Sequence, residues 1–185
     1  SMSSEPEPVS PEEYSEEYFL ERVGGAEFFR LYGPRILKPA LALALARADI
    51  KEGMSVLDLG CGRGELLFQL REKGLKALGA DFAPAAVQIA RRVSHVPVEL
   101  CDAKKLPFEH ASFDRIFFLG VLDHLHDWEL EAVFKEFKRR TITRLDQLKW
   151  FRKIQIKNYV FSWGTCIPSP NIFQIKRQCQ FFGWR

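Results

Sequence analysis

The sequence lacks a hydrophobic run of the length that a membrane-spanning helix needs, which is about 20 residues. Its acidic first residues also lack the basic and then apolar order of a secretory signal. The cysteines, Cys61, Cys101, Cys166 and Cys179, form no C-x-x-C pair and no His/Cys cluster with zinc spacing. These absences exclude a zinc finger and predict a cytoplasmic protein with reduced thiols, no metal site and no membrane partner.

Acidic residues are scarce in the last part of the chain. Residues 135–185 carry 12 Lys/Arg and 2 Asp/Glu, whereas residues 1–134 carry 15 Lys/Arg and 22 Asp/Glu. Basic residues interleaved with aromatics, here Trp150, Phe151, Tyr159 and Trp163, can bind single-stranded nucleic acid. The same segment can also have a different origin from the rest of the chain, so both interpretations stay open.

The remaining pattern predicts a chain of alternating strands and helices. Residues 1–13 are acidic and rich in proline, which predicts disorder. Helical spacing follows from Tyr14 to Tyr32 and again at 35–50, where Pro39 marks either a kink or a first turn. Apolar runs at 54–60, 76–81, 96–103 and 113–121 then alternate with helical segments at 64–74, 83–94 and 126–140. This order predicts an α/β, doubly wound, mostly parallel sheet with helices on both faces.

Alternate glycines mark the junction of the first predicted strand with the next helix. The segment VLDLGCGRG, residues 56–64, places glycine at 60, 62 and 64. Gly60 permits a sharp turn, Gly62 leaves the backbone bare to a ligand, and Gly64 permits close packing at the helix start. Such a loop suits a nucleotide-type ligand, although a tight turn without a ligand accounts for the same motif.

Carboxylates lie in or just after the first three predicted strands. Asp58 precedes the glycine loop, Asp81 ends the second strand and Asp102 ends the third. The carboxyl ends of parallel strands share one edge of a sheet, which is where open α/β folds bind ligands. Asp81 or Asp102 alone could be a helix cap. Together with Asp58 and the glycines they predict a ligand site at this edge, where an acidic group can accept the hydroxyls of a ribose.

Four ordered segments resemble the motifs of class I S-adenosylmethionine-dependent methyltransferases. They are VLDLGCGRG at 56–64, GAD at 79–81, CDAKKLPF at 101–108 and FDRIFFLGVLDHLHD at 113–127. The resemblance covers residues 14–140, implies a Rossmann-like fold and is nearest to the small-molecule group that includes quinone-biosynthesis enzymes. It separates the loop from the G-x-G-x-x-G of NAD enzymes, because position 65 is Glu.

The resemblance implies S-adenosyl-L-methionine as cofactor and a role for each matching residue. Asp58 would hold the ammonium, Gly60, Cys61 and Gly62 would lie along methionine and ribose, and Asp81 would accept the ribose hydroxyls. The adenine would meet Phe82, Asp102 and Ala103, and the methionine part would meet Phe118 and Leu119.

Catalysis by methyl transfer requires a base only when the acceptor carries a proton at the attacked atom. His124, just past the fourth predicted strand, is the candidate base and His126 the second, while a helix start or surface position explains either equally well. Tyr14 and Tyr18 are candidate lid residues, because an N-terminal aromatic helix often covers the cofactor in such families. Packing of both tyrosines on the sheet is the alternative.

The family pattern stops after Arg140. A glycine-rich turn is absent there, the fifth strand is at best Thr141–Thr143, and a helix is predicted at 171–183. We therefore expect late strands that are missing or atypical, with a core at 14–140 and a divergent basic segment at 141–185. The predicted function is methylation of a small molecule; the alternatives are a cofactor-binding but inactive or truncated module and an RNA-binding methyltransferase.

Overall fold

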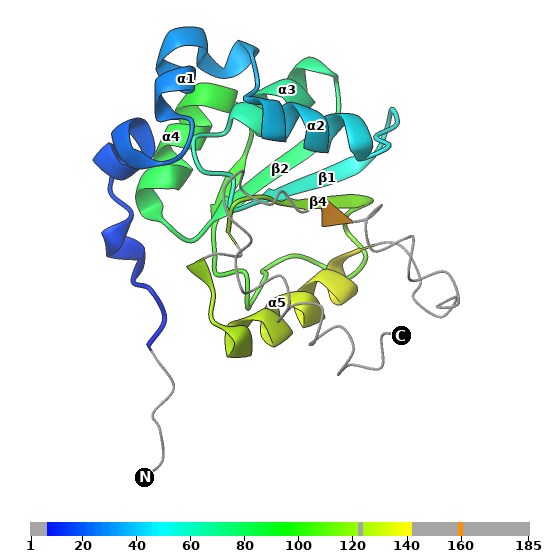
Figure 1. Cartoon of the computed structure of the whole chain (residues 1–185). Helices are drawn as coiled ribbons and strands as arrows, with labels where there is room; N and C mark the ends of the chain where they lie inside the picture. The colour runs from blue at the N-terminus through cyan, green and yellow to red at the C-terminus, as the bar shows by residue number, and fades with distance from the viewer. Residues whose placement is uncertain (1–6, 122–123, 142–158, 161–185) are drawn as a thin grey trace.

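The centre of the molecule is a parallel β-sheet with strand order β3-β2-β1-β4-β5. The computed structural model describes residues 7–121, 124–141 and 159–160 (Figure 1). The strands are β1 (Ser55–Leu59), β2 (Lys76–Asp81), β3 (Val98–Leu100), β4 (Arg115–Phe118) and β5 (Tyr159–Val160). This confirms the Rossmann-like, parallel sheet that the alternating pattern predicts.

Helices cover both faces of the sheet, and neighbouring residues of each strand supply the two cores. The helices are α1 (Ala26–Tyr32), α2 (Pro39–Arg47), α3 (Glu65–Glu72), α4 (Pro84–Ser94) and α5 (Asp127–Arg140). Val56 and Phe117 pack with α2 and α3, whereas Leu57 and Phe118 pack with α5. Figure 1 accordingly shows α5 on the side of the sheet opposite the other helices. Burial on both faces explains why the strands read as continuous apolar runs.

Proline and glycine set several of the helix boundaries. Helix α2 begins at Pro39, so this proline occupies the first turn, where its missing N–H costs nothing, and does not kink the helix. Helix α1 begins directly after Gly25, whose φ of 87° is left-handed. Gly24 and Gly25 therefore interrupt the helical segment between Tyr14 and Tyr32.

The N-terminal segment has local structure before α1. Pro11–Glu13 forms a turn of 3-10 helix, and Tyr18–Arg22 forms a short π-helical turn. Residues 1–13 were expected to be disordered; residues 7–13 are among those described, and 1–6 lie outside them. Val9 packs against the cluster that contains Tyr14 and Phe19, which places this segment beside the body of the domain.

Two of the three residues predicted for the fifth strand, 142 and 143, lie outside the described residues. Thr141 forms an isolated parallel bridge with Phe113, and β4 pairs with β5, in the register Ile116↔Tyr159 and Phe117↔Val160. Thr141 remains tied to α5, because its N–H and its hydroxyl both donate to the Phe137 carbonyl. The helix predicted at 171–183 and most of the basic segment lie outside the described residues. No helix in the described ranges is long and apolar enough to cross a membrane.

Helices α3 and α4 approach each other at Gly64, the residue that directly precedes α3. A Cβ built on Gly64 would lie 2.9 Å from the Ala90 Cα in α4, and the φ of Gly64 is 81°. The glycine is thus required by both the backbone conformation and the space available.

We expect Gly64→Ala to lower the free energy of unfolding by about 2–4 kcal/mol, because left-handed strain and overpacking add. Gly74→Ala is the matched control, since Gly74 has a φ of 71° but nothing within 4 Å of its built Cβ. It should lose only about 1–2 kcal/mol. Urea unfolding measures both, and equal losses would contradict the steric part of the explanation.

Candidate functional site

The glycine loop between β1 and α3 folds back on the end of β2. The N–H groups of Gly60 and Cys61 both donate to the Ala80 carbonyl, at 2.7 and 3.1 Å. Gly60 has a φ of 72°, and a Cβ built there would collide with Val121 Cγ2. The space that a side chain at position 60 would need is filled by Val121, so the absence of a side chain lets the loop pack closely against the segment that follows β4.

Asp81 connects this loop to the start of α4. It is 5% exposed, and its two carboxylate oxygens accept from different N–H groups, Gly62 and Ala83, each at 3.0 Å. Burial raises the pKa of Asp81, while the hydrogen bonds from Ala83, Gly62 and Phe82 act in the opposite direction. One oxygen of Asp81 therefore stabilises the turn before α4, as a helix cap would, and the other binds the glycine loop.

Asp58 is a buried carboxyl group in β1. It is 4% exposed, and among the described residues no hydrogen bond to its side chain is found. Burial first, and then the charges of Glu65 and Asp81, raise its pKa to about 8. A cation placed beside Asp58 would relieve this desolvation, since a buried charge needs a partner of opposite sign.

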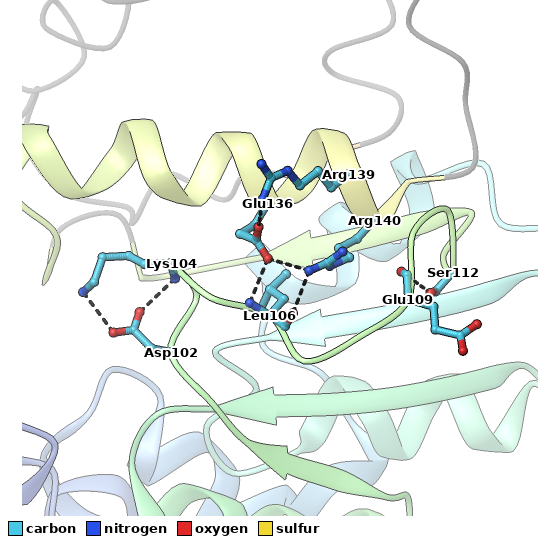
Figure 2. A network of polar contacts seen from close by, with 8 residues as sticks. All are labelled: Asp102, Lys104, Leu106, Glu109, Ser112, Glu136, Arg139 and Arg140. Atoms are coloured by element: carbon cyan, nitrogen blue, oxygen red, sulfur yellow. Dashed lines mark hydrogen bonds and ion pairs between the residues drawn. The ribbon is translucent and has the colours of Figure 1, made fainter.

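Asp102 lies beyond the end of β3 and is held by its own loop. Its side chain is 49% exposed; Oδ1 accepts from the Lys104 N–H at 2.8 Å, and Oδ2 lies 3.1 Å from Lys104 Nζ. Figure 2 shows both contacts. Ala103 is partly buried against the core beneath α5. Asp102 therefore shares the carboxyl edge of the sheet with Asp58 and Asp81, but in a more exposed setting.

The predicted lid residue Tyr14 contacts the candidate base. Its hydroxyl lies 2.8 Å from His124 Nδ1, and its ring lies 5.2 Å from Phe82 and 5.0 Å from Tyr18 between centroids. Burial raises the pKa of Tyr14, which keeps the hydroxyl protonated near neutral pH. His124 itself is exposed. Lid and base candidates that are 110 positions apart in the chain thus meet beside Phe82.

Three predicted cofactor residues direct their side chains into the core. Cys61 packs between α3 and α4, Phe118 packs against Phe137 of α5, and Leu119 packs with the cluster under α2. Burial raises the pKa of the Cys61 thiol well above its ordinary value. Only the backbones of these residues are available to a ligand at the strand ends.

A buried arginine that the sequence interpretation missed joins the loop to the N-terminal segment. Arg63 pairs with Glu65 at 2.7 Å, donates to the Phe19 carbonyl at 2.9 Å and lies 5.1 Å from the centre of the Phe29 ring. The Phe19 ring in turn lies 3.9 Å from a Cβ built on Gly62. The signal in the sequence is an arginine inside a glycine loop with a glutamate two positions later.

His126 occupies the start of α5. Its N–H donates to Glu129 Oε2 at 2.9 Å, and its Nε2 lies 3.1 Å from the Glu7 carbonyl oxygen. These contacts match the helix-start interpretation of His126. Within the described part of the chain, no group of three or more His, Cys, Asp and Glu residues could hold a metal ion.

Comparison with known proteins shows which family part of the chain resembles. Residues 56–142 match the sequence profile of a family described as "Methyltransferase domain". A solved structure, the PH0226 protein from Pyrococcus horikoshii OT3, is 25% identical with a TM-score of 0.51, covering 78% of this chain and 75% of that one. Over these residues the chain is similar to class I methyltransferase domains, and its sheet has the same Rossmann-like fold. This similarity agrees with the family that the sequence motifs resemble.

Curated relatives match this chain over only part of their own length. The uncharacterized protein MJ1252 of Methanocaldococcus jannaschii is 32% identical, over 61% of this chain and 46% of that protein. Demethylmenaquinone methyltransferase of Thermus thermophilus is 35% identical, over 49% of this chain and 42% of that enzyme. The chain therefore spans less than half the length of these two relatives.

The buried Asp58 carboxyl makes the stability of the free protein depend on pH. Because the folded-state pKa of about 8 exceeds the unfolded value of about 4, folding favours the protonated carboxyl. Its stabilising contribution is complete below about pH 4 and is lost as the pH rises through about 8.

We expect Asp58→Asn, which cannot ionise, to be more stable than the wild type at pH 9 by on the order of 2–5 kcal/mol, with little difference at pH 5. Urea unfolding of the free protein at both pH values measures this. Asp49→Asn is the matched control, because the Asp49 side chain is exposed. A stability difference for Asp58→Asn that does not change with pH would contradict the assignment.

Proposed function

We propose that the domain binds S-adenosyl-L-methionine at the carboxyl ends of β1, β2 and β3 and transfers its methyl group to a small-molecule acceptor. The observation that carries this proposal is the buried carboxyl of Asp58, whose pKa is raised to about 8, beside the glycine loop that Asp81 holds at the strand ends. A cationic ligand suits such a site. The methionine part of the cofactor has this character.

The other aspartates suit the remaining parts of the cofactor. Asp81 uses one lone pair on each oxygen for backbone N–H groups, which leaves acceptors for two ribose hydroxyls. Asp102 accepts from the amino group of the adenine, and Phe82 supplies an apolar face for the ring. These assignments rest on the family resemblance together with the shared sheet edge.

The bound cofactor supplies an activated methyl group on a sulfonium. The residues of this chain exclude water and hold the acceptor in line with that methyl group. Tyr14 and Tyr18 cover the site from the N-terminal side. His124 accepts the proton of the acceptor when the attacked atom carries one, and the Tyr14 hydroxyl fixes the direction of its ring.

A small-molecule acceptor of the quinone-precursor type is favoured by one curated relative, the Thermus thermophilus demethylmenaquinone methyltransferase. The RNA alternative rests on the basic segment, most of which lies outside the described residues. The contacts at the site therefore bear on the cofactor, and the acceptor assignment depends on this relative and on the family resemblance.

Calorimetric titration tests the cofactor. We expect S-adenosylmethionine and its demethylated product, S-adenosylhomocysteine, to bind with micromolar dissociation constants, and Asp81→Asn to weaken both by at least about tenfold, since a charged hydrogen bond contributes about 1.5–3 kcal/mol. Asp49→Asn should bind as the wild type does. Absence of heat and of a thermal shift with either ligand would overturn the proposal.

Binding should also release a proton. With a pKa of about 8, Asp58 is protonated at about pH 6.5 in the free protein and must ionise to hold the ammonium. We therefore expect affinity to rise between about pH 6 and pH 8 and to fall above that range, as the amino group of the ligand itself loses its proton near pH 8.

Titrations in buffers of different ionisation enthalpy count the protons. About one proton should leave at about pH 6.5 in the wild type and none in Asp58→Asn, which should also bind more weakly. Equal proton release by both proteins would show that Asp58 is not the group that responds to the ligand.

A further inference from the structure

Lys104 holds the one exposed aspartate of the site in a single orientation. Its N–H and its ammonium contact different oxygens of Asp102, at 2.8 and 3.1 Å (Figure 2). An exposed carboxylate with a single backbone contact is free to rotate, whereas contacts to both oxygens fix the plane of the group. Lys104 therefore determines where the Asp102 carboxylate points.

The ammonium of Lys104 is itself anchored by a buried carboxylate on α5. Lys104 Nζ lies 2.6 Å from Glu129 Oε1, and the Glu129 side chain is only 2% exposed. The second oxygen of Glu129 accepts from the His126 N–H at 2.9 Å, which fixes the carboxylate at the start of the helix. Burial alone would lower the pKa of Lys104, but its hydrogen bonds to Glu129 and Asp102 raise it. The lysine thus stays charged between two carboxylates.

A second attachment ties the same loop to α5 two helical turns later. Glu136 Oε2 accepts from the Leu106 N–H at 2.8 Å, and Arg140 donates to the Leu106 carbonyl at 2.8 Å and contacts Glu136 at 3.0 Å (Figure 2). Glu129 and Glu136 are seven positions apart and therefore lie on one side of the helix. The loop after β3 is thus held against α5 at two points, Lys104 and Leu106.

Lys105 shows that this arrangement is specific to one of two adjacent lysines. Lys105 is exposed, and among the described residues its side chain has no recorded ion pair, whereas Lys104 connects two acidic residues. The two lysines carry the same charge at neighbouring positions. Substitution of each therefore separates the contact with Asp102 from a general effect of charge.

We propose that Lys104, anchored by Glu129, is a positioning residue that aims Asp102 at the amino group of the nucleobase and so sets the preference of the site for adenine. This inference rests on the proposed function, because it needs a cofactor bound at this edge. Hypoxanthine, the base of inosine, presents an oxygen where adenine presents the amino group. A correctly aimed carboxylate would repel it.

The test compares S-adenosylhomocysteine with S-inosylhomocysteine by calorimetric titration. The quantity measured is the ratio of their dissociation constants, because a purely structural defect weakens both ligands together and leaves the ratio unchanged. The test variant is Lys104→Met combined with Glu129→Gln. The double change avoids a buried, unpaired Glu129 carboxylate, which alone could unfold the protein, and the introduced amide oxygen still offers an acceptor to the His126 N–H.

In the wild type we expect adenine to be preferred by at least about tenfold, as for a hydrogen bond to a charged group. Asp102→Asn should abolish this preference, and the double variant should lower the ratio by about fivefold or more. Lys105→Met, the matched control, and Lys104→Arg, the conservative variant, should keep the wild-type ratio.

Each result decides a different step. If the ratio falls for Asp102→Asn but stays at the wild-type value in the folded double variant, the positioning role of Lys104 is overturned while the proposed function stands. If Asp102→Asn leaves the ratio unchanged, Asp102 does not read the base and the inference fails with it. If the wild type binds neither ligand, the proposed function itself fails.

Discussion

The carboxylate of Asp81 joins the parts of the molecule on which the site depends. It lies at the end of β2 and accepts N–H groups from the glycine loop and from the start of α4, while the loop itself is bonded to the Ala80 carbonyl. A parallel sheet brings the ends of β1 and β2 side by side, and Asp81 then holds the loop in place through the Gly62 N–H. Without this bridge, Gly62 would have no partner for its N–H among the contacts described.

This arrangement buries acidic groups, and burial disfavours their charged form. Asp58, Asp81 and Glu65 lie close enough that the charges of Glu65 and Asp81 both raise the pKa of Asp58. Arg63 pairs with Glu65 and limits the excess negative charge, but no described residue does so for Asp58. A site of this kind is less stable in the free protein and is stabilised by a cationic ligand, which links function to folding.

Helix α5 has a second role besides covering the sheet. Its apolar side chains Val133 and Phe137 pack on β1 and β4, while Glu129 and Glu136 hold the loop after β3. The position of Asp102 therefore depends on a helix that follows it in the chain. Changes in the packing of α5 would reach the loop that carries Asp102 through these two carboxylates.

Local pattern was sufficient to predict the parallel sheet, the glycine turn and the three aspartates at its carboxyl edge. These features follow from periodicity, backbone constraints and the rule that parallel strands share that edge. Tertiary structure decided that Tyr14 meets His124, that the fifth strand lies at Tyr159–Val160, and that Lys104 rather than Lys105 holds the third aspartate. A sequence specifies by local chemistry which residues can form a strand or an ion pair. Which of several equivalent residues does so depends on the packing of segments far apart in the chain, and no local window contains that information.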